Sequence, residues 1–121
     1  MSPHSVAPES FLPLSPQVFY VLVALAAGEK HGYAIMRDVD EQTAGAVVLG
    51  PGTLYGSLKR LLAQGLVTEA DARPDPALDD ERRRYYALTG LGRKVVAAES
   101  SRMERQIAAA RRAGAAHGGL A

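Results

Sequence analysis

The chain has 121 residues, the length of one domain with room for one modest hydrophobic core. It carries 14 Lys and Arg against 13 Asp and Glu, so its net charge of +1 does not by itself indicate a nucleic-acid partner. The absence of cysteine excludes disulfides, thiolate nucleophiles and thiolate metal sites. The sequence has neither an apolar run long enough to span a membrane nor a basic-then-apolar leader. We therefore expect no membrane partner and a cytoplasmic location.

Residues 1–13 contain three prolines and no clean periodicity, which predicts a flexible, extended or disordered arm. Phe11 and Leu12 are its candidates for docking on the domain. The first helix is predicted to begin at Ser15 and Pro16, because serine caps helix N-termini and proline suits the first turn. It ends at Gly28.

The first helix is apolar on nearly every side between Val18 and Ala27. A helix of that kind is buried on more than one side. In so small a domain, we expect part of this helix to face a second subunit.

A second helix is predicted over residues 34–43, with Ile35 and Val39 in its apolar stripe. His31 precedes it and has two interpretations, a ligand or catalyst and a structural hydrogen-bonding residue. The other two histidines lie in the predicted tails, so we favour the structural role and expect no metal. Tyr33 either donates a hydrogen bond to a DNA phosphate or packs with its hydroxyl in water.

The β-branched residues 46–49 predict a very short strand before the break at Gly50-Pro51-Gly52. A third helix follows over residues 51–64, and Gly65 is its predicted C-cap. Four leucines recur at the spacing of one helical face: Leu54, Leu58, Leu61 and Leu62.

The opposite face of this helix is small, basic and hydrogen-bonding, and it contains no carboxylate. An ordinary solvated face fits that pattern. A recognition helix also fits it, because small residues let the backbone approach a DNA groove while Lys and Arg meet phosphates or guanine edges. The candidate DNA-binding residues here are Pro51, Gly52, Thr53, Tyr55, Ser57, Lys59 and Arg60.

Residues 68–88 predict a β-hairpin, since two short alternating segments flank a polar, proline-containing loop over 71–81. Tyr86 and Leu88 fall on one face of the second strand. Three arginines, Arg82, Arg83 and Arg84, stand between this loop and the second strand. They either contact DNA or form a solvated, salt-bridged turn with the preceding acids.

The last helix is predicted over residues 90–113, with Thr89 as its N-cap and a fraying tail over 114–121. It is too long for the small body to cover, so we expect a symmetric copy to bury its apolar stripe. The candidate residues for a ligand pocket or dimer interface are Phe19, Tyr20, Val23, Leu91, Val95, Val96, Met103 and Ile107.

This order of elements predicts a mainly α fold with a small β-hairpin, namely a winged helix-turn-helix domain over 14–89 and a C-terminal dimerisation helix over 90–113. The third helix would enter the major groove of double-stranded DNA. The β-hairpin over 68–88, which we call the wing, would lie on the DNA backbone or in the minor groove. The alternative is a winged-helix protein-interaction module that never binds DNA. No nucleophile triad, carboxylate pair or phosphate loop supports an enzyme or a cofactor.

The chain also resembles the PadR family of winged-helix transcription regulators over about residues 14–110. The resemblance is carried by Leu14-Ser15 and the run to Leu25, residues 28–35 with His31-Gly32-Tyr33, residues 49–55 from Leu49 to Tyr55, Leu58-Lys59-Arg60-Leu61, Gly65-Leu66-Val67, and residues 82–92. It implies a short-form homodimer held by the last helix against the partner's first helix. It also implies an inverted-repeat operator, usually repression, and in many members relief by a small aromatic or lipophilic ligand. The long, acid-flanked wing loop departs from the family pattern.

Overall fold

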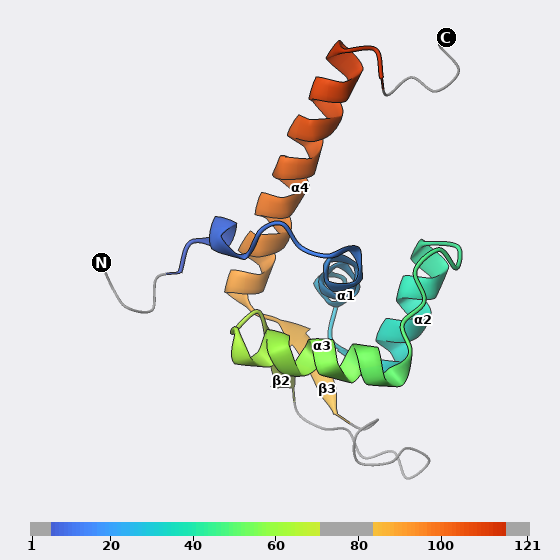
Figure 1. The fold of residues 1–121 in the computed structure, drawn as a ribbon. Helices are drawn as coiled ribbons and strands as arrows, with labels where there is room; N and C mark the ends of the chain where they lie inside the picture. The colour runs from blue at the N-terminus through green and yellow to red at the C-terminus, as the bar shows by residue number, and fades with distance from the viewer. Residues whose placement is uncertain (1–5, 71–83, 116–121) are drawn as a thin grey trace.

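The computed structural model describes residues 6–70 and 84–115, which form a small body from which one long helix projects (Figure 1). In chain order the elements are η1 (Pro8–Phe11), α1 (Pro16–Ala26), β1 (Lys30–His31), α2 (Gly32–Gln42), α3 (Pro51–Ala63), β2 (Val67–Ala70), β3 (Tyr85–Leu88) and α4 (Gly90–Arg112). The predicted mainly α fold with a small β-hairpin is confirmed. None of the helices in these two ranges is both long and apolar enough to cross a membrane.

The sheet is antiparallel and has the strand order β1-β3-β2. Strands β2 and β3 pair from Val67 opposite Leu88 to Ala70 opposite Tyr85. Along β3, Tyr86 and Leu88 are buried, as the alternation predicted. The strand predicted at residues 46–49 is wrong, because these residues form a bend and an extended segment, and the third strand is β1. A two-residue strand has no periodicity by which a sequence pattern can reveal it.

The hydrophobic core lies between α1, α2, α3, the sheet and the base of α4. The leucines predicted for the inner face of α3 are buried at Leu54, Leu58 and Leu61, while Leu62 is only partly buried. The largest fully buried apolar side chains are Leu22, Leu25, Ile35, Leu54, Leu58, Leu66, Val21, Val39 and Val95.

Side-chain caps begin α1 and α4 where the sequence predicted them, at Ser15 and Thr89. Ser15 Oγ accepts the Val18 N–H at 3.2 Å, and Thr89 Oγ1 accepts the Gly92 N–H at 2.9 Å. His31 Nδ1 accepts the Ala34 N–H at 3.1 Å, which is a structural role and requires the neutral ring to carry its proton on Nε2.

The end of α3 has the backbone of a Schellman motif. Gly65 has φ +76°, the left-handed conformation that glycine adopts without strain. Its N–H donates to Leu62 O, and the Leu66 N–H donates to Leu61 O. Thr89 Oγ1 also donates to Gly65 O at 2.6 Å, so the end of the third helix is tied to the start of α4.

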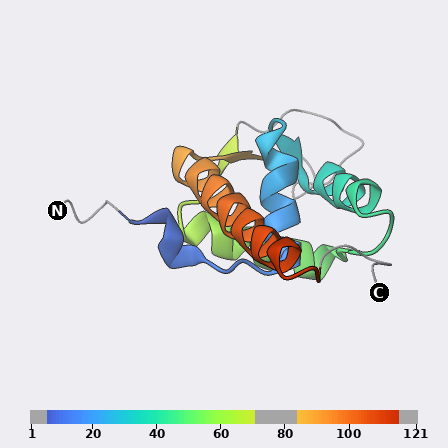
Figure 2. The same cartoon turned by 90° about the horizontal axis from the view of Figure 1, so that it is seen from above.

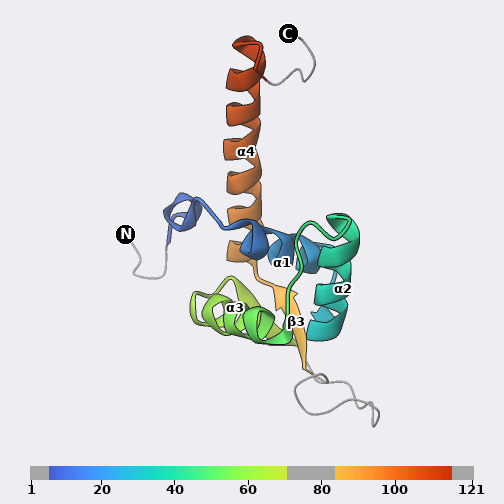
Figure 3. The same cartoon turned by 45° about the vertical axis from the view of Figure 1, so that its right-hand side comes forward.

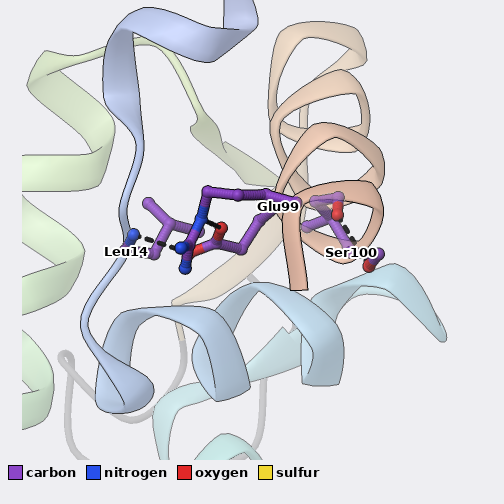
Figure 4. A network of polar contacts seen from close by, with 5 residues as sticks. Leu14, Glu99 and Ser100 are labelled. Atoms are coloured by element: carbon purple, nitrogen blue, oxygen red, sulfur yellow. Dashed lines mark hydrogen bonds and ion pairs between the residues drawn. The ribbon is translucent and has the colours of Figure 1, made fainter. Parts of the chain in front are cut away.

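The N-terminal segment is attached to the base of α4. Residues 8–11 form the 3-10 helix η1, and Phe11 and Leu12 pack against the core. The Leu14 N–H donates to Glu99 Oε2 at 2.7 Å, and Arg102 Nε donates to Glu99 Oε1 (Figure 4). Part of the arm predicted over residues 1–13 is therefore structured, because η1 packs against α4 and Glu99 holds Leu14, the residue after the arm. Residues 1–5 lie outside the described residues.

Seen along α4, η1 lies on one side of the helix and α1 on the other (Figure 2). Beyond its contacts with η1 and α1, the rest of α4 extends away from the body (Figure 3). Val95 belongs to the fully buried core, so assigning it to a ligand pocket or dimer interface is wrong. Its position on α4 faces the chain's own body, which the apolar stripe of the sequence did not reveal.

Candidate nucleic-acid interface

Helix α3 lies along the edge of the body that is farthest from the projecting end of α4 (Figures 1 and 3). Its inner leucines fix its rotation, and this leaves Gly52, Thr53, Lys59 and Arg60 exposed. The helix contains no Asp or Glu, so this outer face is basic. Pro51 is also exposed, at the first turn of the helix. A backbone N–H at this position has no intrahelical acceptor, so the missing N–H of proline costs the helix no hydrogen bond.

Two of the predicted DNA-binding residues on α3 lie elsewhere than on the outer face. Ser57 is only 3% exposed, so direct contact between its side chain and a base is excluded in this conformation. Its position lies beside the core leucines on the helical wheel, closer to the buried side than predicted. Tyr55 is half-buried, and its ring fills the space above Gly32, where a Cβ would come within 2.8 Å of Tyr55 Cζ. Tyr55 therefore packs α3 onto the start of α2.

Arg60 occupies the flank of α3 that faces the N-terminal segment. Its Nη2 donates to Ser57 Oγ at 3.3 Å, and its Nη1 is 4.0 Å from where a Cβ on Gly56 would stand. The guanidinium thus lies back across the helix, between the buried Ser57 and the small Gly56. Ser57 orients a basic side chain at the edge of the outer face.

Lys59 occupies the opposite flank, which faces the wing. A groove runs between this flank and strands β2 and β3, and the charged residues that line it in the described part of the chain are Lys59, Glu69 and Arg84. Arg84 Nη1 lies 3.8 Å from Glu69 Oε1. Arg84 is the one member of the predicted arginine triplet within the described part of the chain; Arg82 and Arg83 lie outside it. Glu69 was not among the residues predicted from the sequence, although its i+2 spacing from buried Val67 places both on the same side of β2.

Tyr33 is 54% exposed at the start of α2, and it lines a shallow hollow next to Pro51. Arg37 and Val48 line the same hollow, and both are exposed. Neither residue was among those predicted from the sequence. The i, i+4 spacing of Tyr33 and Arg37 could have indicated that Arg37 shares the helix face of Tyr33. Val48 is 72% exposed, which only the path of the α2–α3 connection decides.

The residues predicted for a ligand pocket or dimer interface lie on two helices that contact each other, α1 and α4. Except for Val95, they keep part of their surface exposed. Phe19 and Tyr20 pack edge to face, with ring centroids 5.7 Å apart. The partly buried members are Phe19, Tyr20, Val23, Leu91, Val96 and Met103, while Ile107 is 46% exposed.

The described residues contain no group of three or more His, Asp or Glu side chains placed to hold a metal ion. What they do assemble is a helix-turn-helix pair with a basic outer helix, beside a two-stranded wing that carries Arg84. This arrangement defines the winged helix-turn-helix class, whose members use the outer helix and the wing to contact DNA.

The chain belongs to the Transcriptional regulator PadR-like family, whose sequence profile matches residues 21–98. Members of this family are transcription regulators rather than enzymes. An uncharacterized 37.1 kDa protein in transposon TN4556 of Streptomyces fradiae is 44% identical over 85 residues. That match covers 70% of this chain but only 22% of the relative, so the chain corresponds to a small part of the longer protein.

Solved structures support the same fold. A PadR family transcription regulator from Clostridium difficile R20291 superposes with a TM-score of 0.66 at 21% identity, covering 81% of this chain and 97% of that one. Bacillus subtilis PadR, solved in complex with operator DNA, superposes with a TM-score of 0.60 at 23% identity, covering 71% of this chain and 47% of that one.

Proposed function

We propose that this chain is a homodimeric, sequence-specific transcriptional repressor that acts in the cytoplasm and binds an inverted-repeat operator. The observation that carries the proposal is the exposed, carboxylate-free face of α3, with Tyr33 beside its first residue Pro51 and the wing along its Lys59 flank. A DNA major groove admits a helix of this kind, and a basic face without acids meets phosphate without repulsion.

The proposed contacts divide into two groups. Thr53 and Lys59 reach base edges from the outer face of α3, and Arg60 joins them if its guanidinium swings away from Ser57. Tyr33, beside the start of α3, and Arg84, on the wing, contact phosphates together with Arg82 and Arg83. Gly52 and Pro51 let the start of the helix approach the groove closely. Ser57 supports Arg60 from behind rather than reading a base.

The second subunit is proposed to cover the part of α4 that leaves the body. Met103 and Ile107 continue the apolar stripe of α4 there, and Ile107 keeps nearly half of its side chain exposed in one copy of the chain. A two-fold partner would bury this stripe and place two α3 helices about one DNA turn apart, ~34 Å. The resemblance to PadR regulators favours an interface between α4 and the partner's α1.

A small aromatic or lipophilic effector is proposed to act at the junction of α1 and α4, near Phe19, Tyr20, Val23 and Met103. The exposed parts of these side chains lie where two helices of the same chain meet, so an inserted ligand would change the angle of α4. Such a ligand shifts the dimer away from the operator-binding arrangement only by its difference in affinity for the two arrangements.

The primary experiment is selection of bound duplexes from a random library by the purified full chain, together with its mass in solution. An enriched inverted repeat bound by a dimer is the expected result. If the protein enriches no sequence and the log–log dependence of duplex binding on salt is flat, phosphates are not contacted. The winged-helix protein-interaction module would then be the better account.

The base-reading assignment is tested on the selected operator with Lys59→Ala and Arg60→Ala. Each is expected to weaken operator binding by about 1–3 kcal/mol while leaving thermal stability unchanged, because both side chains are exposed. Arg111→Ala, in the last turn of α4, removes the same charge far from α3 and serves as the matched control. If both variants bind the operator as tightly as the control, α3 is not the recognition helix.

A further inference from the structure

Glu69 and Arg84 face each other across the wing, on the side that looks toward α3. Glu69 pairs with Tyr86 in the β2–β3 register, and Arg84 stands two residues before Tyr86, on the same side of its strand. Both line the groove whose other wall includes Lys59 and Gly56 of α3. Among the described residues that line this groove, Glu69 is the one acid.

This ion pair is loose and accessible to solvent. The Arg84 Nη1 to Glu69 Oε1 distance is 3.8 Å, and the two side chains are 57% and 48% exposed. An exposed pair of this kind contributes at most about fivefold to an equilibrium constant. A competing anion can therefore displace the carboxylate without unfolding the wing.

A DNA phosphate is such a competitor, because a phosphate and a carboxylate offer the same oxygen acceptors to a guanidinium. The groove that holds the pair adjoins the outer face of α3, so a duplex seated on α3 brings its backbone to Arg84. We propose that Glu69 is an intramolecular competitor of DNA phosphate for Arg84, and that it lowers the sequence-independent part of the affinity for DNA. This inference rests on the proposed function.

Competition by Glu69 lowers the affinity for every duplex equally. Phosphate contacts carry no sequence information, so weakening one of them lowers the affinity for operator and non-operator DNA by the same factor. The affinity for random DNA then stays low, while the base contacts of α3 are left intact. Glu69 is in this sense a positioning residue, since it acts on DNA only through the side chain of Arg84.

The test measures binding of wild type, Glu69→Gln, Arg84→Gln and the double variant to the selected operator and to a scrambled duplex, over a range of salt. Glu69→Gln is expected to tighten binding to both duplexes by the same factor, roughly two- to fivefold at low salt. Its log–log salt slope should be steeper by up to about 0.9, the value for one further phosphate contact. In the Arg84→Gln background the gain should disappear.

Glu104→Gln is the matched control, because it removes the same charge from an exposed position on α4. Thermal unfolding of each variant checks that the wing remains folded. No gain in Glu69→Gln, or a gain that persists without Arg84, would overturn the competition. A loss confined to the operator would also overturn it and would make Glu69 a base-reading residue. Failure of the wild type to bind either duplex would instead refute the proposed function, before any variant is compared.

Discussion

The two halves of α4 differ in their surroundings. The first half, with Gly92, Val95 and Glu99, is buried against the body and the N-terminal segment. The second half, with Met103 and Ile107, extends beyond the body into solvent (Figure 3). The first half of α4 completes the core of one chain, while the second half carries an apolar stripe that its own chain leaves partly exposed. Substitutions in the first half should lower stability, and those in the second half should weaken association.

The largest expected effect in the first half comes from Gly92→Ala. A Cβ on Gly92 would stand 2.7 Å from Leu88 Cδ1 and closer still to the backbone oxygen of Leu66, so the start of α4 must shift. We expect a loss of about 3 kcal/mol in the free energy of unfolding, measured by chemical denaturation. Gly90→Ala is the matched control: its Cβ would meet no atom within 4 Å, and we expect stability equal to or slightly above that of the wild type. Equal stability in the two variants would show that α4 is not packed at Gly92 as described.

Glu99 is the next test of the docked half. Glu99→Gln keeps the shape of the side chain but removes its charge, and with it the charged acceptor for the Arg102 Nε–H and the Leu14 N–H. We expect a loss of about 1.5–3 kcal/mol in the free energy of unfolding. Glu104→Gln, at an exposed position five residues further along α4, should leave the stability within about 0.5 kcal/mol of wild type.

The contacts of Glu99 also make the stability of the fold depend on pH. The hydrogen bond from Arg102 lowers the pKa of Glu99 below its usual 4.5; burial opposes this effect, and the Leu14 N–H adds to it. A group whose pKa is lower in the folded state binds its proton more readily when unfolded. Its contribution is therefore complete above pH 4.5 and is lost as the pH falls below that value. Denaturation curves between pH 7 and pH 3 should show a smaller acid-induced loss in Glu99→Gln than in the wild type.

The smallest expected effect tests the projecting half. Ile107→Ala should weaken the proposed dimer by about 1 kcal/mol per subunit, because a half-exposed side chain has only its remaining surface to bury. Sedimentation over a dilution series measures this directly. Monomer stability should not change, in contrast to Gly92→Ala. Val48→Ala, which removes an exposed aliphatic side chain far from α4, is the control. A dimer constant unchanged by Ile107→Ala would exclude this face from the interface.

The sequence was most informative where a local signal decides the structure. Ser15, Thr89 and Gly65 cap their helices through contacts within a few residues, so propensity and spacing were sufficient to place them. The leucine spacing of α3 likewise oriented the helix correctly at Leu54, Leu58 and Leu61. The sequence was least informative where the partner is distant. Glu99 and Leu14 are 85 residues apart, and no local pattern links them.

The candidate interface divides in the same way. Lys59 and Thr53 were placed on the outer face by periodicity alone, and the structure leaves both exposed. Ser57 was misplaced because the helical wheel gives an angle but not how far the neighbouring elements reach around the helix. Glu69 was overlooked because the groove that it lines exists only once β2 has packed beside α3.

By itself, the sequence determined the four α-helices, the caps of α1 and α4, the wing and the family, because each depends on residues close together in the chain or on a recurring combination of motifs. Tertiary structure decided which side chains are exposed at the interface, how the N-terminal segment docks, and where α4 leaves the body. These features depend on contacts between segments far apart in the sequence, and their energies are fixed only when the whole core is assembled.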